Sequence, residues 1–284
     1  MAFSIAVFLG MAPMASAERS PENAALKVRL PQAVKDRGYL MVGNAAAVSP
    51  PWSYHPDNDA QKYDGFDVDL AKEFARRLGV GVKFESVAFA TLIPGVQSGR
   101  YDIGMQGMAD TPARQQVVDM VDYMFAGDGI VLPAANPKNI AKIEDLCGTK
   151  TAVVVGSSQA KLVEAQSAAC AAPIAILQFP AVAEAYVSLR SGRADAYVYG
   201  YEISSYMKTS GAPQFEGLEL LPDIMNMSIK AIAVRKDFPE LRDLVRDMIQ
   251  DMIVDGSYQE LADKWGLGRN VVKAPDINNH LMKP

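Results

Sequence analysis

The chain has 284 residues, enough for one large domain or two domains of ordinary size, each with its own core. Apolar residues make up 49% and charged residues 21%, a globular composition that leaves little room for disorder. The net charge of −5 argues against nucleic acid as a partner, because neutralising phosphates requires clustered Lys and Arg.

Residues 1–17 have the pattern of a secretory signal peptide cleaved after Ala17. The apolar run is too short to span a bilayer, and small residues at Ala15 and Ala17 precede the polar Glu18. A signal peptide usually has a Lys or Arg before its apolar run, and none is present here, which would be explained if translation starts upstream of Met1. The alternative to a signal peptide is a buried N-terminal helix. No later stretch is apolar enough to cross a membrane, so we expect a soluble, exported protein.

Two cysteines, Cys147 and Cys170, both lie in the part expected to be exported. In an oxidising compartment a single pair is most simply a disulfide, although two buried free thiols are the alternative. Neither cysteine stands at a lipid-attachment position behind the apolar run.

Strands and helices alternate along the first half of the chain. A short helix precedes a strand at Tyr39 to Gly43, and residues 65–80 form a helix that Gly79 ends. Its apolar face carries Val68, Leu70, Ala71, Phe74, Ala75 and Leu78. A strand at 82–87, a helix at 89–100 and a strand at 101–107 follow. This order predicts an α/β fold with a mostly parallel sheet.

The second half repeats this order with a strand at 149–156, a helix at 157–169, a strand at 174–180, a helix at 181–193 and a strand at 194–200. In both halves a helix ends on Ser-Gly-Arg, one residue intervenes, and an Asp enters the next strand, in "SGRYD" and "SGRAD". A repeated unit indicates two lobes of one design.

The end of the chain predicts a strand and two helices over residues 227–267, which we expect to pack on the first lobe. Two crossings near "YMFAGDGIVLP" and "MNMSIKAIAV" would then join the lobes. We therefore expect residues 18–126 in lobe 1, residues 127–228 in lobe 2, and residues 229–284 returning to lobe 1.

Four stretches resemble the polar amino-acid-binding proteins of bacterial ABC importers. They are "GFDVDLAKEFARRLGV", "FATLIPGVQSGRYDIGMQGMADTPARQQVVDMVDYM", "DLCGTKTAVVVGSSQ" and "KDFPELRDLVRDMIQDMIVDGSYQELADKWGL". The resemblance implies the type II periplasmic binding fold, two α/β lobes with a two-crossing hinge. It also implies a monomer in the periplasm that captures an amino acid or a related small carboxylate between the lobes. The closed form would then meet an inner-membrane ABC permease, and neither a cofactor nor a metal is implied.

As the resemblance implies, Arg114 grips the ligand carboxylate, which suits a guanidinium because its paired donors match two carboxylate oxygens. Thr111, Ser157 and Ser158 would offer hydroxyls and amides to the same group, and Phe89 and Trp52 would form apolar walls. Residue type alone also allows a solvated arginine, a helix cap at Ser157 and core aromatics.

Several positions depart from the family pattern. Gly200 stands where an acid usually pairs with the ligand's α-ammonium, and Ala46, Ser49 and Ala109 replace an acid, an aromatic and a hydroxyl residue. Gly107 is also among the residues that we expect to line the ligand site. Either Glu202 or Asp110 supplies the missing charge, or the ligand is betaine-like and needs aromatic faces. Such faces are available at Trp52, Tyr54, Phe89, Tyr197, Tyr199 and Tyr201.

Catalysis is the rival class of function. The only histidines are His55 and His280, and no G-x-S-x-G turn, P-loop or metal-spaced Cys/His cluster occurs. Dehydratases share this fold, and Glu202 could act as an acid or base, so the fold alone leaves catalysis open. A third class, a sensor domain that feeds a membrane kinase, would need a transmembrane segment, and we expect none in this sequence. We expect a binding protein and not an enzyme.

Overall fold

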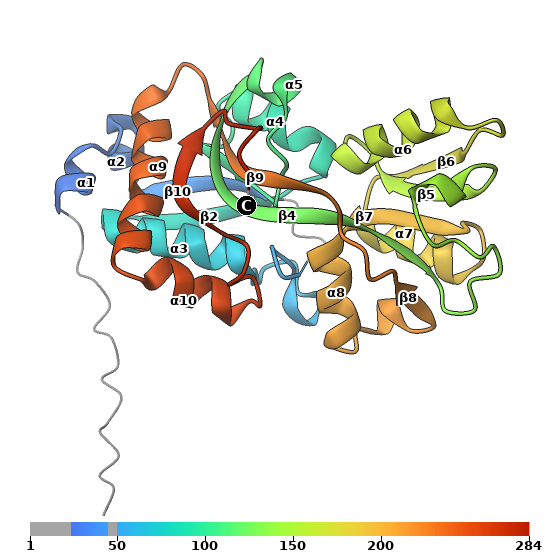
Figure 1. Cartoon of the computed structure of the whole chain (residues 1–284). Helices are drawn as coiled ribbons and strands as arrows, with labels where there is room; N and C mark the ends of the chain where they lie inside the picture. Colours follow the sequence, from blue (N-terminus) through green and yellow to red (C-terminus); the bar gives the residue numbers. More distant parts are fainter. Residues whose placement is uncertain (1–23, 45–49, 284) are drawn as a thin grey trace, which may run out of the picture.

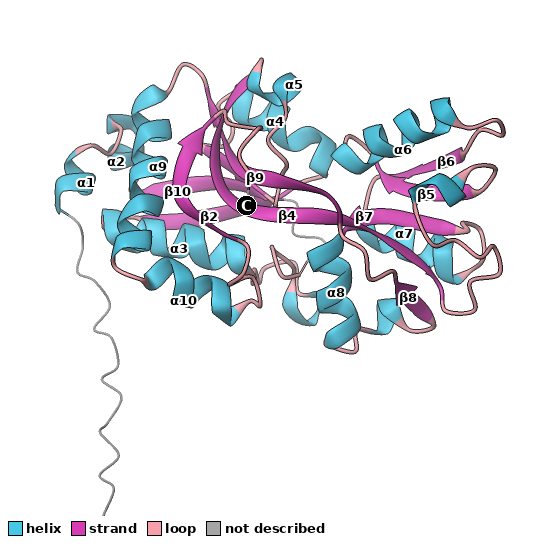
Figure 2. Cartoon of the chain, viewed as in Figure 1, coloured by secondary structure: helices cyan, strands magenta, loops and turns pink. Residues whose placement is uncertain are grey.

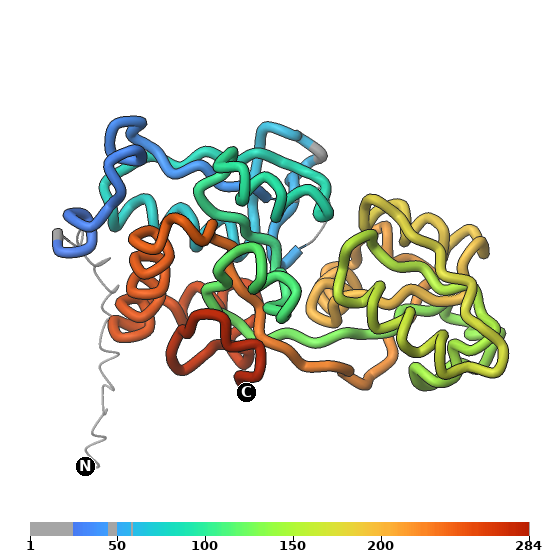
Figure 3. The backbone as a smooth tube through the Cα atoms, turned by 90° about the horizontal axis from the view of Figure 1, so that it is seen from above, coloured from blue at the N-terminus to red at the C-terminus, as the bar shows by residue number. Residues whose placement is uncertain are grey.

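The computed structural model describes residues 24–44 and 50–283 and shows two lobes (Figures 1 and 3). The expected signal peptide lies outside the described residues, as do Ala46 and Ser49. No described helix is both long enough and apolar enough to pass through a membrane.

The first lobe is built on three parallel strands in the order β2-β1-β3. Its elements are α1 (Ala24–Val28), α2 (Gln32–Arg37), β1 (Tyr39–Asn44), η1 (Pro56–Asn58), α3 (Phe66–Leu78), β2 (Gly81–Ser86), α4 (Phe89–Gln97), β3 (Ile103–Met105) and α5 (Pro112–Gln115). The predicted helix at 65–80 is confirmed as α3, and Gly79 ends it in the left-handed conformation that glycine adopts without strain.

The second lobe repeats this arrangement, with parallel strands in the order β6-β5-β7. Its elements are η2 (Ile143–Leu146), β5 (Lys150–Val154), α6 (Ser158–Ala169), β6 (Ala175–Phe179), α7 (Val182–Arg190), β7 (Ala196–Gly200), α8 (Tyr201–Thr209), η3 (Pro213–Phe215) and β8 (Leu218–Leu220). The predicted strands and helices of this half are confirmed, whereas α8 and β8 were not predicted.

The repeated Ser-Gly-Arg-x-Asp motif has the same structural role in both lobes. Asp102 donates its backbone N–H to the carbonyl of Met41 at 2.9 Å, and its carboxylate accepts from the amide of Met41 at 2.6 Å. Asp195 makes the same two bonds with Lys150, at 2.7 and 2.8 Å. In each lobe the aspartate thus fixes the start of one parallel strand to the amino-terminal half of its neighbour.

Two long strands, β4 (Val118–Pro133) and β9 (Met225–Arg235), run antiparallel and pass from one lobe to the other (Figure 2). β9 pairs with β3 of the first lobe, and β4 pairs with β7 of the second. The sheet is therefore continuous and mixed, in the order β2-β1-β3-β9-β4-β7-β5-β6. Each lobe is parallel only in its own three strands, because a chain that crosses and returns must run in opposite directions.

The last part of the chain lies against the first lobe, with α9 (Pro239–Val254), α10 (Ser257–Lys264) and β10 (Val271–Ile277). Arg77 of α3 is 1% exposed and pairs with Asp251 at 2.5 Å and with Asp255 at 2.7 Å. This buried charge connects segments that are far apart in the sequence. The expected boundaries at 126/127 and 228/229 fall inside β4 and β9, and they stay a prediction.

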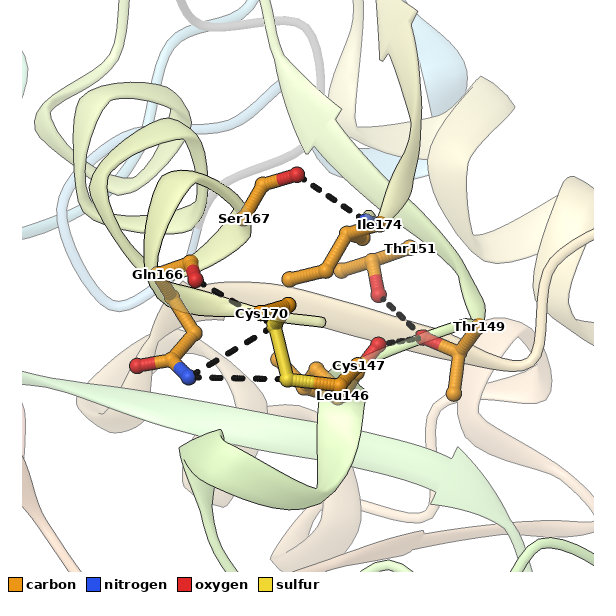
Figure 4. Close-up of a disulfide and its surroundings, with 8 residues drawn as sticks. All are labelled: Leu146, Cys147, Thr149, Thr151, Gln166, Ser167, Cys170 and Ile174. Atoms are coloured by element: carbon orange, nitrogen blue, oxygen red, sulfur yellow. Dashed lines mark hydrogen bonds between the residues drawn. A yellow bond between two sulfur atoms is a disulfide. The ribbon is translucent and has the colours of Figure 1, made fainter. Parts of the chain in front are cut away.

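Cys147 and Cys170 form a disulfide between the end of η2 and the end of α6, and Gln166 lies beside it (Figure 4). The predicted pairing is confirmed, and no free cysteine occurs among the described residues. The bond closes a loop between residues 23 positions apart, which removes conformational freedom from the unfolded chain.

Replacing both cysteines by serine should lower the free energy of unfolding by about 3 kcal/mol, the loop-closure cost of a loop of this length. Urea unfolding measures the loss, and a fully reduced wild-type sample serves as the control. Ligand affinity should stay within about threefold, because the bond lies outside the cavity walls described below. A double variant with wild-type stability would contradict the loop-closure account.

Candidate functional site

A cavity lies between the lobes, with about 460 Å³ of empty space that is partly open to solvent, and both lobes and both crossing strands form its wall. The lining residues are Trp52, Phe89, Gln106, Gly107, Ala109, Arg114, Ala126, Gly127, Val154, Ser157, Ser158, Gln159, Tyr199, Gly200, Glu202, Ile203 and Lys230. Arg114, Ser157, Ser158, Phe89, Trp52, Ala109, Gly107, Gly200 and Glu202 were expected in the site and line this cavity, whereas Thr111 does not.

The short helix α5 presents Arg114. Thr111 is its N-cap, Pro112 occupies the first turn, and the Thr111 hydroxyl accepts from the Arg114 amide at 3.4 Å. Thr111 is not among the residues that line the cavity, and its expected contact with the ligand stays a prediction. Its side chain turns to the open amides of its own helix, so it positions the backbone of Arg114.

The Arg114 guanidinium joins the two lobes. It donates from Nη1 to the carbonyl of Ala109 at 2.6 Å and from Nη2 to the carbonyl of Gly156 at 3.2 Å, in the turn before α6. Its carbon lies 5.4 Å from the centre of the Phe89 ring. Burial lowers the pKa of Arg114 to about 10, against a raising effect of Asp110, so the group stays charged at neutral pH.

Facing Arg114, the N-terminal end of α6 brings Ser157 and Ser158 into the cavity wall. Ser157 is buried and acts as the N-cap, since its hydroxyl accepts from the Ala160 amide at 3.1 Å and donates to the Val154 carbonyl at 2.7 Å. Ser158 and the first-turn amides of α6 are then the groups that can meet an anion, which a helix N-terminus favours.

The position of the Trp52 ring in the cavity wall depends on the lack of a side chain at Gly107. This residue has a φ of +54°, and a Cβ there would lie 2.7 Å from the indole ring. The Gly107 amide donates to the buried carboxyl of Asp67 at 3.0 Å, and Tyr123 Oη donates to the same carboxyl at 2.7 Å. Burial raises the pKa of Asp67 to about 7, although both hydrogen bonds oppose the rise.

Glu202 is the acidic residue in the cavity wall. Its carboxylate accepts from the Gly127 amide at 3.2 Å and from Asn270 Nδ2 at 3.1 Å, and burial raises its pKa. Asp110, the other candidate, lies outside the wall and accepts from Gln115 Nε2 at 2.9 Å. The geometry thus favours Glu202 over Asp110 as the carboxylate that a ligand would meet.

Only part of the expected aromatic set reaches the cavity, namely Trp52, Phe89 and Tyr199. Tyr197 is fully buried and stacks on Tyr199, with ring centres 5.2 Å apart. Tyr54 and Tyr201 do not line the wall, and the Tyr54 hydroxyl donates to Asp64 at 3.2 Å.

Sequence reasoning missed Lys230, which lines the cavity from β9 with only 4% of its surface exposed. The available signal was a single charge inside the apolar run "SIKAIAV". Gln106 and Gln159 were also missed. Gln106 accepts from the Ser53 hydroxyl at 2.8 Å, and Gln159 donates to the buried Asp128.

Residues 40–268 match the family model of the bacterial extracellular solute-binding proteins, family 3. The chain belongs to this family. Relatives of family 3 that it resembles include the arginine-binding protein ArgT of Corynebacterium glutamicum, at 29% identity over 89% of this chain and 82% of the relative.

Two solved structures are similar to this family 3 protein over most of its length. One is an ancestral arginine-binding protein bound to arginine, with 34% identity and a TM-score of 0.73 over 81% of this chain and 98% of that chain. The other is an ancestral amino acid-binding protein, a precursor of cyclohexadienyl dehydratase, with 33% identity and a TM-score of 0.73 over 82% and 97%. The expected two-lobed α/β fold is confirmed.

Replacing Gly107 by alanine should weaken ligand binding at least about tenfold, because the new methyl group would displace the Trp52 ring. The control is Gly192→Ala, at a φ of +72° with nothing within 4 Å of its Cβ. Both variants should lose about 1–2 kcal/mol of stability to backbone strain, but the control should keep its affinity. Calorimetry and thermal melting measure the two effects, and equal affinities would contradict this role of Gly107.

Proposed function

We propose that this protein captures an amino acid or a closely related carboxylate between its lobes and delivers it to an inner-membrane ABC permease from the periplasm. The observation that carries the proposal is the Arg114 guanidinium, held at the cavity wall by carbonyls of both lobes. A guanidinium can bind both oxygens of a carboxylate, and that of Arg114 uses only two of its five N–H donors in these bonds.

The positions of the hydrogen-bond donors on the two lobes explain why a ligand would close the lobes. A carboxylate on Arg114 also lies near the N-terminal end of α6, which belongs to the other lobe. Because such a ligand interacts with both lobes only when they approach, it stabilises the closed form over the open form. The two crossing strands β4 and β9 are the elements about which this motion takes place.

An amino acid is favoured over a betaine-like ligand on two grounds. Glu202 offers a carboxylate in the wall that can accept from an ammonium group, and a methylated cation would need a fuller aromatic cage than three rings supply. The relatives named above bind arginine or are called amino acid-binding. Together these observations support an α-amino acid as the ligand.

Capture without conversion is the second element of the proposal. One similar structure is a precursor of a dehydratase, and the raised pKa of Glu202 would suit an acid catalyst. However, the Glu202 carboxylate is held by two protein donors, and the relatives named above are described as binding proteins. Recovery of chemically unchanged ligand after incubation with the protein supports capture, and a new product would overturn it.

Replacing Arg114 by alanine should weaken the binding of the protein's ligand at least about 100-fold, because the ligand carboxylate would lose its charged partner. The ligand comes from a thermal-shift screen of amino acids, betaines, amines and carboxylates, in which specific binding raises the melting temperature with dose. Arg193→Ala is the matched control, since Arg193 also lies over a phenylalanine ring, at 5.5 Å from Phe179, but outside the cavity. Near-normal affinity of Arg114→Ala in calorimetry would refute the assignment.

Replacing Gly200 by aspartate should shift the ligand preference about tenfold toward ligands with an additional positive charge, since the new carboxylate would enter the cavity wall. Gly200 has a φ of −57°, which any residue adopts, and as the N-cap of α8 it also accepts an aspartate favourably. Ala181→Asp, at the N-cap of α7, is the control that adds a cap without changing the cavity. An unchanged ranking of ligands in calorimetry would count against this map of the site.

A further inference from the structure

Lys230 is a buried ammonium group at the centre of the interlobe region. It stands on β9, opposite Met124 of β4, and its backbone forms a bridge to Ala109. Its side chain is 4% exposed and still lines the cavity. A charge at this depth is costly unless anions or hydrogen-bond acceptors compensate it.

The protein compensates this ammonium only in part. Lys230 Nζ donates one hydrogen bond, to the Ser228 hydroxyl at 3.0 Å, whereas an ammonium has three donors. Across residues 24–44 and 50–283, no ion pair joins Lys230 to a carboxylate. Two donors are therefore available on a group that borders the cavity.

The charged groups around Lys230 have other partners. Asp128 accepts from Gln159 and from Asn226 Nδ2, the latter at 2.9 Å, and Glu202 accepts from Gly127 and Asn270. Both carboxylates raise the pKa of Lys230, but burial and the nearby Arg114 act in the opposite direction, and the net effect is a lowered pKa. Arg114 and Lys230 are the cations among the residues that line the cavity and Glu202 is the lining carboxylate, whereas Asp128 acts on Lys230 from outside the lining and is hydrogen-bonded to Gln159 and Asn226.

This arrangement matches a ligand with two anionic groups and one ammonium. We propose that Lys230 determines specificity by binding a second carboxylate, so that the site prefers acidic amino acids to their amide or cationic counterparts. The inference rests on the proposed function, in which Arg114 holds the first carboxylate and Glu202 faces the ammonium. Lys230 then joins the ligand to a hinge strand, in addition to the two lobes.

The direct test compares isosteric ligands on the unmodified protein. Calorimetry with L-glutamate, L-aspartate, L-glutamine and L-asparagine should show tighter binding of at least one acid than of its own amide, by about tenfold or more. L-Arginine should bind more weakly than the preferred acid. If the amides or arginine bind as tightly as the acids, the inference is wrong, and this result needs no variant.

Lys230→Met provides the second arm, because methionine keeps the length of the side chain and removes its charge. It should lower the affinity for the preferred acid about 10–100-fold and lower the affinity for the amide by a clearly smaller factor, because a neutral carbonyl gains less from an ammonium than a carboxylate does. Lys236→Met, just after the end of β9 and paired with Asp119 at 3.5 Å, is the control for loss of a lysine outside the cavity. Circular dichroism melting verifies that both variants are folded.

Other outcomes separate this inference from the proposed function. A uniform loss of affinity for acids and amides in Lys230→Met would mean that Lys230 shares the first carboxylate with Arg114, which overturns the inference but not amino-acid capture. Unchanged affinities would likewise overturn it alone. If the wild-type protein binds no amino acid, the proposed function fails, and the inference fails with it.

Discussion

The interlobe cavity depends on one guanidinium that is hydrogen-bonded to both lobes at once. Arg114 contacts the carbonyl of Ala109 on its own side and the carbonyl of Gly156 across the cavity. These two bonds orient the planar donor group and leave its remaining N–H groups for an anion. The charge is maintained despite burial, since a pKa of about 10 is still far above neutral pH.

The fold makes the contact of Arg114 with both lobes possible, because it brings loops of both lobes together at the interlobe cavity. In each lobe an aspartate after a Ser-Gly-Arg turn fixes the amino-terminal part of one parallel strand to its neighbour, at the end opposite the loops that line the cavity. The carboxyl ends of such strands are where ligands of open α/β sheets bind. Among the described residues β4 and β9 are the strands that cross between the lobes, and so few connections allow the lobes to move relative to each other.

Much of this structure could be predicted from the sequence, because local signals were strong. Gly79 and the apolar face of residues 65–80 defined α3, and the repeated turn motif indicated two similar lobes. The length of β4 was not predicted, since the strand is buried along nearly its whole length and its sequence, interrupted by aspartates and glycines, lacks the regular alternation that marks a strand. The sheet consequently has an antiparallel centre that strand and helix order alone did not reveal.

The cavity wall contains residues that were expected there from their own motifs, and it also contains residues whose position depends on tertiary placement and that no motif indicated. Thr111 was expected to face the ligand, but local hydrogen bonding directs it to the amides of α5. Lys230 carries no motif, and only the pairing of β9 with β4 brings its ammonium to the cavity. The choice between Glu202 and Asp110 likewise required the positions of α8 and the strands around it.

A crystal structure of the protein with the ligand found by the thermal-shift screen tests the central claim most directly. The account predicts a carboxylate in two-pronged contact with Arg114, at hydrogen-bond distance from the first turn of α6, with the lobes closed around it. A ligand bound outside the interlobe cavity, or an Arg114 guanidinium directed into bulk water in the complex, would contradict it.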